Sequence, residues 1–304
     1  MLVDLALHLF LLFVFAPLFL GVITKTKALF AGRVGAPLLQ PYYDLFRLFN
    51  KGFVFSKTTT WVFFLGPVVG LIVPILASLF IPFGGISAPV SFEGDLILFV
   101  YLFGLSRFFT VVAALDTGSS FEGMGAAREV TFSCLAEPTM FFCLLVLARL
   151  TDGFSLNRLF GPHLQGAWHS GSGASLGLVL VCLFVVLLVE NSRIPFDDPN
   201  THLELTMVHE VMVLDHSGPL FGMVLYGSAL KLMVMGALLV KLAIPLRTGW
   251  WLNDAGVFLA GLIGLAVLIG VVESTIARLR LPRIPQVLVG TSLLSIFALV
   301  LVLR

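Results

Sequence analysis

The chain has 304 residues, of which 59% are hydrophobic and 12% are charged, and its formal net charge at pH 7 is +1. Soluble domains usually contain about 25% charged and about 45–50% apolar residues, so this composition excludes a large soluble domain. It is typical of proteins whose solvent is the lipid bilayer, which roughly 20 apolar residues in a helix can cross. We therefore expect one integral membrane domain over residues 1–304, not a soluble enzyme, and no nucleic-acid partner.

Apolar runs of spanning length follow one another along the chain. They lie near residues 2–24, 60–83, 96–115, 130–149, 176–194, 220–245, 255–275 and 284–303. The first run exceeds the apolar segment of a signal peptide, about 7–15 residues, and no basic segment precedes it, so we expect it to be retained. The predicted fold class is all-α: a polytopic membrane protein with about eight transmembrane helices.

Basic residues between the predicted spans are unevenly distributed. Most lie in the first loop, at Lys25, Lys27, Arg33, Arg47, Lys51 and Lys57, and in the seventh, at Arg278, Arg280 and Arg283. The third and fifth loops add Arg128 and Arg193, whereas the even-numbered loops hold little beyond Arg158 and Arg247. Because short loops rich in Lys and Arg stay in the cytoplasm, we expect a multi-pass protein of the inner (cytoplasmic) membrane with both termini outside.

The first loop also contains a short amphipathic segment. In residues 38–49, with the sequence LLQPYYDLFRLF, apolar and charged positions segregate with helical spacing. Such a helix places its apolar face in the boundary between headgroups and acyl chains. We predict a surface amphipathic helix in this first cytoplasmic loop.

Several ionisable residues interrupt the apolar runs. Arg107, Glu137 and Lys231 lie inside predicted spans, and Glu190, Lys241 and Glu273 lie near span ends. Each such residue costs at least about 2.5–3.5 kcal/mol to insert, so these residues usually face protein or water and mark a path for ions or protons. An internal salt bridge, or a long side chain that reaches the interface, is the alternative for each of them.

The most acidic stretch follows the fifth span. Its carboxylates are Asp197, Asp198, Glu204, Glu210 and Asp215. Apolar residues alternate with these acids, which suggests a loop packed against membrane or protein, where burial raises carboxylate pKa values and lets the groups pass protons. A simply solvated loop is the alternative. His202 and His209, seven residues apart, are either proton carriers or hydrogen-bonded structural residues.

The sequence lacks the usual signatures of a cofactor site. Cys134, Cys143 and Cys182 lie in apolar runs without CxxC spacing, which argues against an iron–sulfur cluster or structural zinc. His209-Glu210 is not followed by the second histidine of an HExxH site, because position 213 is Val. Glycine-rich phosphate loops are absent where a strand and a helix would be needed. We expect no metal or other cofactor to be bound by this chain.

Several stretches, taken in order, resemble one family. They are GRVGAPLLQPYYDLFRLF at 32–49, SRFFTVVAALDTGSSFEGMGAAREVTFSCLAEP at 106–138, ENSRIPFD at 190–197, the span with Lys231, and ESTIARLRL at 273–281. Together they are similar to the subunit-1-type membrane protein of respiratory complex I, the NADH:quinone oxidoreductase (NADH dehydrogenase). They are also similar to its relatives in group 4 membrane-bound nickel–iron hydrogenases, such as formate hydrogenlyase subunit 4. Residues 115–129 and 273–281 bring the resemblance closer to the hydrogenase branch.

The resemblance implies a subunit without redox centres, placed between a peripheral electron-transferring arm and antiporter-like membrane subunits. Iron–sulfur clusters, and possible nickel–iron, would then belong to partner subunits. The resemblance matches Glu137, Glu190, Asp197 and Glu204 to acids of the family. With the intramembrane charges and the other residues of the matching stretches, those predicted for proton or ion transfer are Glu137, Glu190, Asp197, Glu204, Arg107, Asp116, Lys231 and Glu273. Arg33, Gln40, Asp44 and Arg193 match positions that face the arm in the family, and with Arg128 and Arg278 they are the residues predicted for docking. Asn200 and His202 replace two of the closely spaced glutamates of the family, and Glu204 alone matches the third.

The resemblance leaves the function open between three alternatives. The first is a non-catalytic subunit that couples the redox reaction of the arm to translocation of H⁺ or Na⁺. The second is a quinone-binding subunit of a complex I-like dehydrogenase, in which the aromatic first loop and the acidic loop line an entry tunnel. The third is an autonomous secondary transporter, which would require inverted repeats with broken helices in both halves. Pro67 and Pro74 share one span without an evident counterpart later in the chain, which disfavours the transporter.

Overall fold

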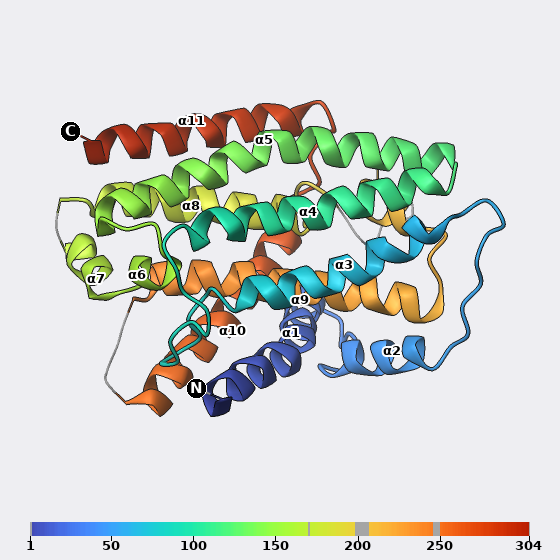
Figure 1. Ribbon diagram of the computed structural model, residues 1–304, viewed down its shortest axis with the longest axis horizontal. Coiled ribbons are helices and arrows are strands. Elements are labelled where there is room, and N and C mark those ends of the chain that lie inside the picture. The colour runs from blue at the N-terminus through green and yellow to red at the C-terminus, as the bar shows by residue number, and fades with distance from the viewer. Residues whose placement is uncertain (1, 170, 198–206, 246–249, 304) are drawn as a thin grey trace.

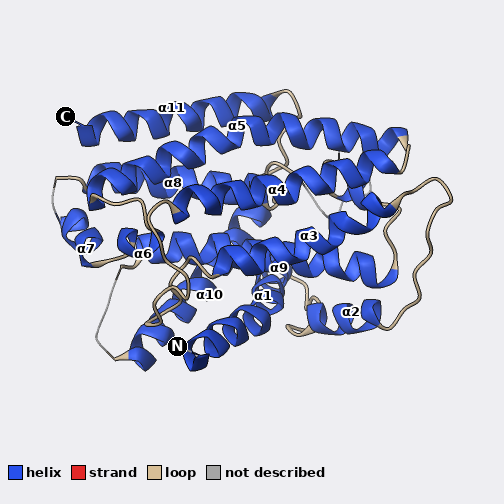
Figure 2. Cartoon of the chain, in the orientation of Figure 1, coloured by secondary structure: helices blue, strands red, loops and turns tan. Residues whose placement is uncertain are grey.

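The computed structural model describes residues 2–169, 171–197, 207–245 and 250–303, and these residues are helical apart from their connections (Figure 2). The helices are α1 (Leu2–Phe30), α2 (Gln40–Phe49), α3 (Trp61–Ser78), α4 (Asp95–Asp116), α5 (Ser120–Thr151), α6 (Leu156–Leu159), α7 (Pro162–His169), α8 (Gly173–Glu190), the 3₁₀-helix η1 (Glu210–Val213), α9 (Gly218–Ala243), α10 (Trp251–Thr275) and α11 (Arg283–Leu303).

The prediction of an all-α fold with about eight spans is confirmed. Among the described residues, eight helices are long and apolar enough to cross a membrane: α1, α3, α4, α5, α8, α9, α10 and α11. Each of them overlaps one predicted apolar run. The protein is therefore a multi-pass membrane protein whose backbone hydrogen bonds are satisfied within helices, as the bilayer interior requires.

The largest difference from the sequence prediction lies in α5. This helix begins at Ser120, not near residue 130, and carries Pro138 in its interior. Its 32 residues correspond to about 48 Å at 1.5 Å per residue, which exceeds the hydrocarbon thickness of about 30 Å. Hydropathy reports only the lipid-immersed part of a helix, so the polar turns that extend α5 were not predicted.

The segment 38–49 also forms a helix, α2, which begins at Gln40 with Pro41 in its first turn. None of its residues is buried, and it contacts α1 and α9 (Figure 1). The Tyr42 hydroxyl donates a hydrogen bond to the carbonyl oxygen of Val14 in α1. The helix therefore lies beside the bundle, and its position at a membrane surface stays a prediction.

The central element of the bundle is α9, which contacts α1, α3, α8 and α10 (Figure 1). In its most apolar stretch 67% of the residues are buried, compared with 22% in the peripheral α11. Two further helix groups adjoin α9: α3 packs along α4, and α5, α8 and α11 pack against one another. This arrangement places α8 against both α5 and α9, and the middle of α4 reaches the end of α8 through the Arg107 side chain.

Close approach of α3 and α9 depends on a glycine. A Cβ atom added at Gly227 would lie 2.6 Å from the carbonyl oxygen of Gly70. Membrane helices that pack this closely use small residues, because dispersion contacts replace the hydrophobic drive available in water. Gly227 therefore sets the separation of these two helices, one turn before Lys231.

We predict that Gly227→Ala destabilises the fold by about 1–3 kcal/mol, because the new methyl group overpacks a backbone contact that cannot relax. The matched control is Gly264→Ala in α10, where an added Cβ meets no atom within 4 Å. Thermal unfolding of the detergent-purified protein checks both variants. Equal melting temperatures for the two would contradict the proposed tight contact.

Candidate functional site

A buried arginine joins the middle of two helices to the end of a third. The guanidinium of Arg107, in α4, donates through Nη1 to Glu137 Oε1 of α5 and through Nη2 to Glu190 Oε1 of α8. Its Nε lies 3.7 Å from Oε1 of Glu129, which also belongs to α5. The planar fork of arginine suits this role, because it offers several donors in fixed directions to separate carboxylates. Arg107 thereby holds α4, α5 and α8 together within the span.

Lys231 of α9 completes this cluster. Its Nζ donates to Glu190 Oε2 at 2.9 Å and to the Glu190 backbone carbonyl at 2.6 Å. Glu190 is the last residue of α8, where unpaired carbonyl groups carry partial negative charge. One ammonium group therefore neutralises both a side chain and a helix end. We call Arg107, Glu129, Glu137, Glu190 and Lys231 the arginine cluster.

The charges of the arginine cluster do not balance. With all five groups ionised, two cations face three carboxylates, so either one proton or one further cation is required for neutrality. The carboxylates also differ in surroundings: the side chain of Glu190 is 6% exposed and that of Glu137 is 41% exposed. Arg107 thus connects a carboxylate inside the bundle with one near its outer surface.

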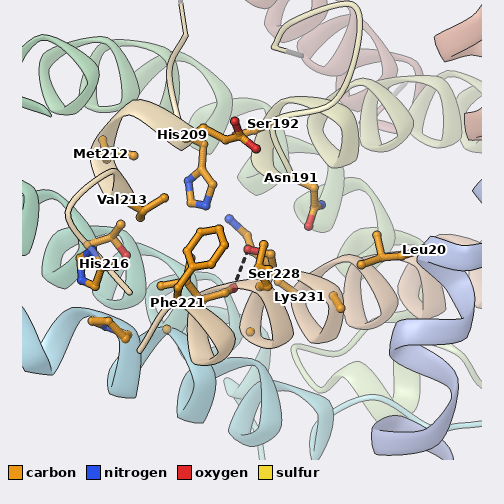
Figure 3. A pocket seen from close by; sticks show the side chains of 18 of the residues that line it. Leu20, Asn191, Ser192, His209, Met212, Val213, His216, Phe221, Ser228 and Lys231 are labelled. Carbon is orange, nitrogen blue, oxygen red and sulfur yellow. Dashed lines mark hydrogen bonds between the residues drawn. The ribbon is translucent and has the colours of Figure 1, made fainter. Parts of the chain in front are cut away.

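A cavity of about 470 Å³ adjoins the inner side of the arginine cluster. Residues of α1, α2, α3, α4 and α9 and of the connection between α8 and α9 line it. In Figure 3, His209 borders the space from one side, Phe221, Ser228 and Lys231 of α9 border it from the other, and Leu20 of α1 lies at an edge. Arg107, Glu129 and Glu190 also reach the cavity, so the site combines ionised groups with an apolar wall.

Two further ion-paired groups lie on the same side of the bundle. Glu273 of α10 has no exposed side-chain surface and pairs with Lys27 at 2.8 Å and Arg193 at 3.4 Å. Asp197 accepts hydrogen bonds from Arg278 Nη2 at 2.9 Å and from the backbone N–H of Val208 and of His209, each at 3.1 Å. These contacts tie the connection after α8 to α1 and α10 and fix the wall of the cavity.

Two histidines, His209 and His216, lie near the cavity, and burial disfavours the charged form of each. His216 stacks on Phe63, with ring centroids 4.0 Å apart, and burial lowers its pKa to about 4. Burial also lowers the pKa of His209, against the opposite effect of the charge on Glu129. His202, the suggested partner of His209 in proton transfer, lies outside the described residues.

The structure brings five of the predicted ion-transfer residues into or beside this site: Arg107, Glu137, Glu190, Asp197 and Lys231. Glu273 lies in the neighbouring triad with Lys27 and Arg193. Asp116 is elsewhere, at the end of α4, where it accepts hydrogen bonds from the backbone N–H of Thr60 at 2.7 Å and from its hydroxyl at 2.9 Å. Glu204 lies outside the described residues. Arg107, Glu137, Glu190, Lys231 and Glu273 thus form ion pairs, as in the salt-bridge alternative, whereas Lys241 donates to the carbonyl oxygen of Gly84.

The residues predicted to dock a peripheral arm fall into two groups. Arg33, Gln40 and Asp44 lie in the first loop and α2, where Gln40 Nε2 donates to Asp44 Oδ1 at 2.9 Å and Asp44 reaches the cavity. Arg128, Arg193 and Arg278 make internal contacts, to the Met207 carbonyl oxygen, Glu273 and Asp197 respectively.

Glu129 and Lys27 were not predicted as site residues. Glu129 precedes the apolar run of α5, and Lys27 was assigned to the basic first loop, although α1 continues to Phe30. Helical spacing was the available signal: Glu129 and Glu137, eight residues apart, are about 80° apart around a continuous helix and so share one broad face. This spacing can be recognised only if the helix is extended toward its N-terminus, beyond the apolar run that begins near residue 130.

Within the described residues no group of three or more His, Cys, Asp or Glu side chains is arranged to hold a metal ion. Comparison with solved structures identifies the same architecture in the membrane-bound sulfane sulfur reductase (MBS), an archaeal respiratory membrane complex. One of its chains superposes with a TM-score of 0.82 at 22% identity, covering 98% of this chain and 99% of that one. At this identity the likeness establishes the fold.

Sequence comparisons establish the family. A family model described as NADH dehydrogenase matches residues 3–303. The chain is 30% identical to formate hydrogenlyase subunit 4 of Escherichia coli (strain K12), covering 91% of this chain and 90% of the relative. It is 32% identical to hydrogenase-4 component C of the same organism, covering 89% and 86%, and 28% identical to the H-type subunit of NADH-quinone oxidoreductase from Syntrophotalea carbinolica, covering 87% and 82%. The chain therefore belongs to the NADH dehydrogenase family of membrane subunits, which it shares with these hydrogenase and oxidoreductase components.

Proposed function

We propose that this chain is the membrane subunit, itself without redox centres, of a complex I-like or group 4 hydrogenase-type oxidoreductase. It anchors a peripheral electron-transferring arm and couples the redox reaction of that arm to translocation of protons or Na⁺. The observation that carries the proposal is the arginine cluster, where three carboxylates share two cations beside a cavity of about 470 Å³. An excess of one carboxylate in a buried cluster favours the binding of a proton or a further cation there, which supports a role in ion transfer.

The energies involved are compatible with coupling. Movement of one charge across 100 mV corresponds to about 2.3 kcal/mol, and one pKa unit to about 1.36 kcal/mol. A change of charge or conformation in the cavity could supply this work by altering the proton affinities of the cluster carboxylates. The required change is about two pKa units in total. Lys231 and Arg107 remain the fixed positive charges around which the carboxylates exchange protons.

The arm would dock on the side of the bundle that holds the first loop, α2 and the connection between α8 and α9. Arg33, Gln40 and Asp44 lie there, and Asp44 also lines the cavity, which links the docking surface to the arginine cluster. The excess of Lys and Arg in the first and seventh loops supports a cytoplasmic location for this side, with both termini on the outer side of the inner membrane. Antiporter-like membrane subunits would contact a lateral surface of the bundle, which faces the plane of the membrane.

A second candidate function is quinone binding. The cavity lining includes the apolar residues Leu20 and Ile23 of α1, Leu45 of α2 and Phe221 of α9 as well as the charged groups. Such a lining suits a molecule with an apolar tail and a polar head, since small-molecule sites combine apolar walls with a few polar groups. The electron acceptor of the arm would then occupy this chain rather than a partner.

We predict that Glu137→Gln and Glu190→Gln each reduce ion translocation at least about tenfold while the complex still assembles. Glutamine keeps the shape of the side chain but cannot ionise, so the exchange of a proton at either position is blocked. Proton and sodium uptake into vesicles that contain the complex, measured with redox turnover, distinguishes the two ions.

The matched control is Glu93→Gln, which removes an exposed carboxylate paired with Arg158 outside the spans. It is expected to leave translocation unchanged. Undiminished translocation per turnover by an assembled Glu137→Gln, Glu190→Gln double variant would reject the coupling role.

For the quinone candidate, we predict that Leu20→Trp in the intact complex raises the KM for a short-chain quinone about tenfold with little change in kcat, because the indole fills part of the cavity. Phe10→Trp, on the exposed surface of the same helix, is the control. Turnover that is independent of added quinone, with no quinone extracted from the purified complex, would exclude this candidate.

A further inference from the structure

The outer side of the arginine cluster reaches the lateral surface of the bundle. The Glu137 side chain is 41% exposed there, and Arg107 is the one ion-pair partner that the described residues provide for it. Neighbouring positions on α4 and α5 are apolar or uncharged and exposed: Tyr101, Leu105, Phe108, Val130 and Cys134. We call these five residues and Glu137 the Glu137 face.

The Glu137 face contains a notch made by a glycine. A Cβ atom built on Gly104 of α4 would lie 3.7 Å from Glu137 Oε1, so the carboxylate lies over a position without a side chain. Tyr101 and Phe108 flank Gly104 on the same side of α4 at helical spacing and form the rim. Tyr101 also packs edge-on against Phe141 of α5, with ring centroids 5.9 Å apart. The notch is therefore bounded by aromatic side chains held in place.

Lipid is a poor occupant of this notch. Glu137 lies about 21 Å along α5 from its end at Thr151, which leaves about 9 Å to the other boundary of a hydrocarbon layer of about 30 Å, so phospholipid headgroups lie at a different depth. A charged group that faces hydrocarbon costs at least about 2.5–3.5 kcal/mol. The arginine cluster moreover lacks one positive charge or proton. A helix with a proton-donating side chain would supply both the missing contact and the missing charge.

We propose that the Glu137 face is the binding surface for a transmembrane helix of another membrane subunit, and that this helix places a Lys, Arg or His side chain against Glu137. The inference rests on the proposed function, from which a membrane partner is expected, and adds where the partner binds and with which chemistry. Small residues such as Gly104 allow the close helix approach that hydrogen bonding across a membrane interface requires. The partner's donor would join Glu190, Arg107 and Glu137 in one line from the cavity to the neighbouring subunit.

Site-specific photo-crosslinking in the intact complex tests the surface. A photoreactive phenylalanine analogue is placed at Phe108, which is 60% exposed on the Glu137 face, or at Phe10, which is 59% exposed on α1. We expect Phe108 to give an adduct with another polytopic subunit at least about tenfold above the yield from Phe10, since the one position is in contact and the other faces lipid. Mass spectrometry of the adduct identifies the helix and its basic residue.

Two variants test the chemistry. Gly104→Leu fills the notch without changing charge, and its Cβ has room, so we expect correct insertion and about tenfold less adduct from Phe108. Glu137→Gln keeps the shape and removes the charge, so we expect a weaker adduct that is restored when the partner's basic residue is replaced by a neutral one.

Three results would overturn the inference: adducts of Phe108 with lipid alone, adducts with a second copy of this chain, or a crosslinked helix that has no basic side chain at this depth. Crosslinking does not depend on ion translocation, so the two proposals fail separately. Loss of translocation in Glu137→Gln together with lipid adducts at Phe108 would leave the coupling role intact and remove the interface.

Discussion

The fold depends on one constraint: a guanidinium group inside the membrane must be surrounded by carboxylates. Arg107 lies in the middle of α4 and is 9% exposed, so without partners its burial would be very costly. Glu137 and Glu190 satisfy it from two other helices, and Lys231 in turn satisfies Glu190 from the central α9. Four helices are thereby fixed in register by charge, where apolar packing alone would allow them to slide.

The same constraint shapes the chemistry available to the site. Arginine does not release its proton at any physiological pH, so Arg107 acts as a fixed charge, and only the carboxylates around it can change protonation state. Their environments differ, because Glu190 is enclosed by two cations while Glu137 has one and lies at the outer surface. Because the environments of Glu137 and Glu190 differ, their proton affinities differ, and this gives proton exchange between them a preferred direction.

Much of this organisation was predictable from sequence, for identifiable reasons. Long apolar runs give the eight spans, because the bilayer sets a minimum length and forbids unpaired backbone groups. The high cost of charge in lipid singled out Arg107, Glu137 and Lys231 before their contacts were known. Pairings such as Lys27 with Glu273, or Glu129 with Arg107, were not predictable, since they join residues distant in sequence and depend on helices that continue past their apolar runs. Asp116 lies apart from the arginine cluster, where it accepts a hydrogen bond from Thr60 at the start of α3, and its role in ion transfer stays a prediction.

Pro138 follows Glu137 directly within α5 and gives that helix a mechanical property. Proline has no N–H, so the carbonyl group of Cys134, one turn earlier, loses its usual donor and the helix is softened at this level. Gly125, before this hinge, packs against Val211 and Met212 of η1, and Thr139, after it, hydrogen-bonds to Ser292 of α11. A few degrees of bending at Pro138 would therefore move the Glu137 carboxylate sideways, toward or away from Arg107. Movement of η1 at one end of α5 would in this way change the contacts of a carboxylate in the middle of the helix.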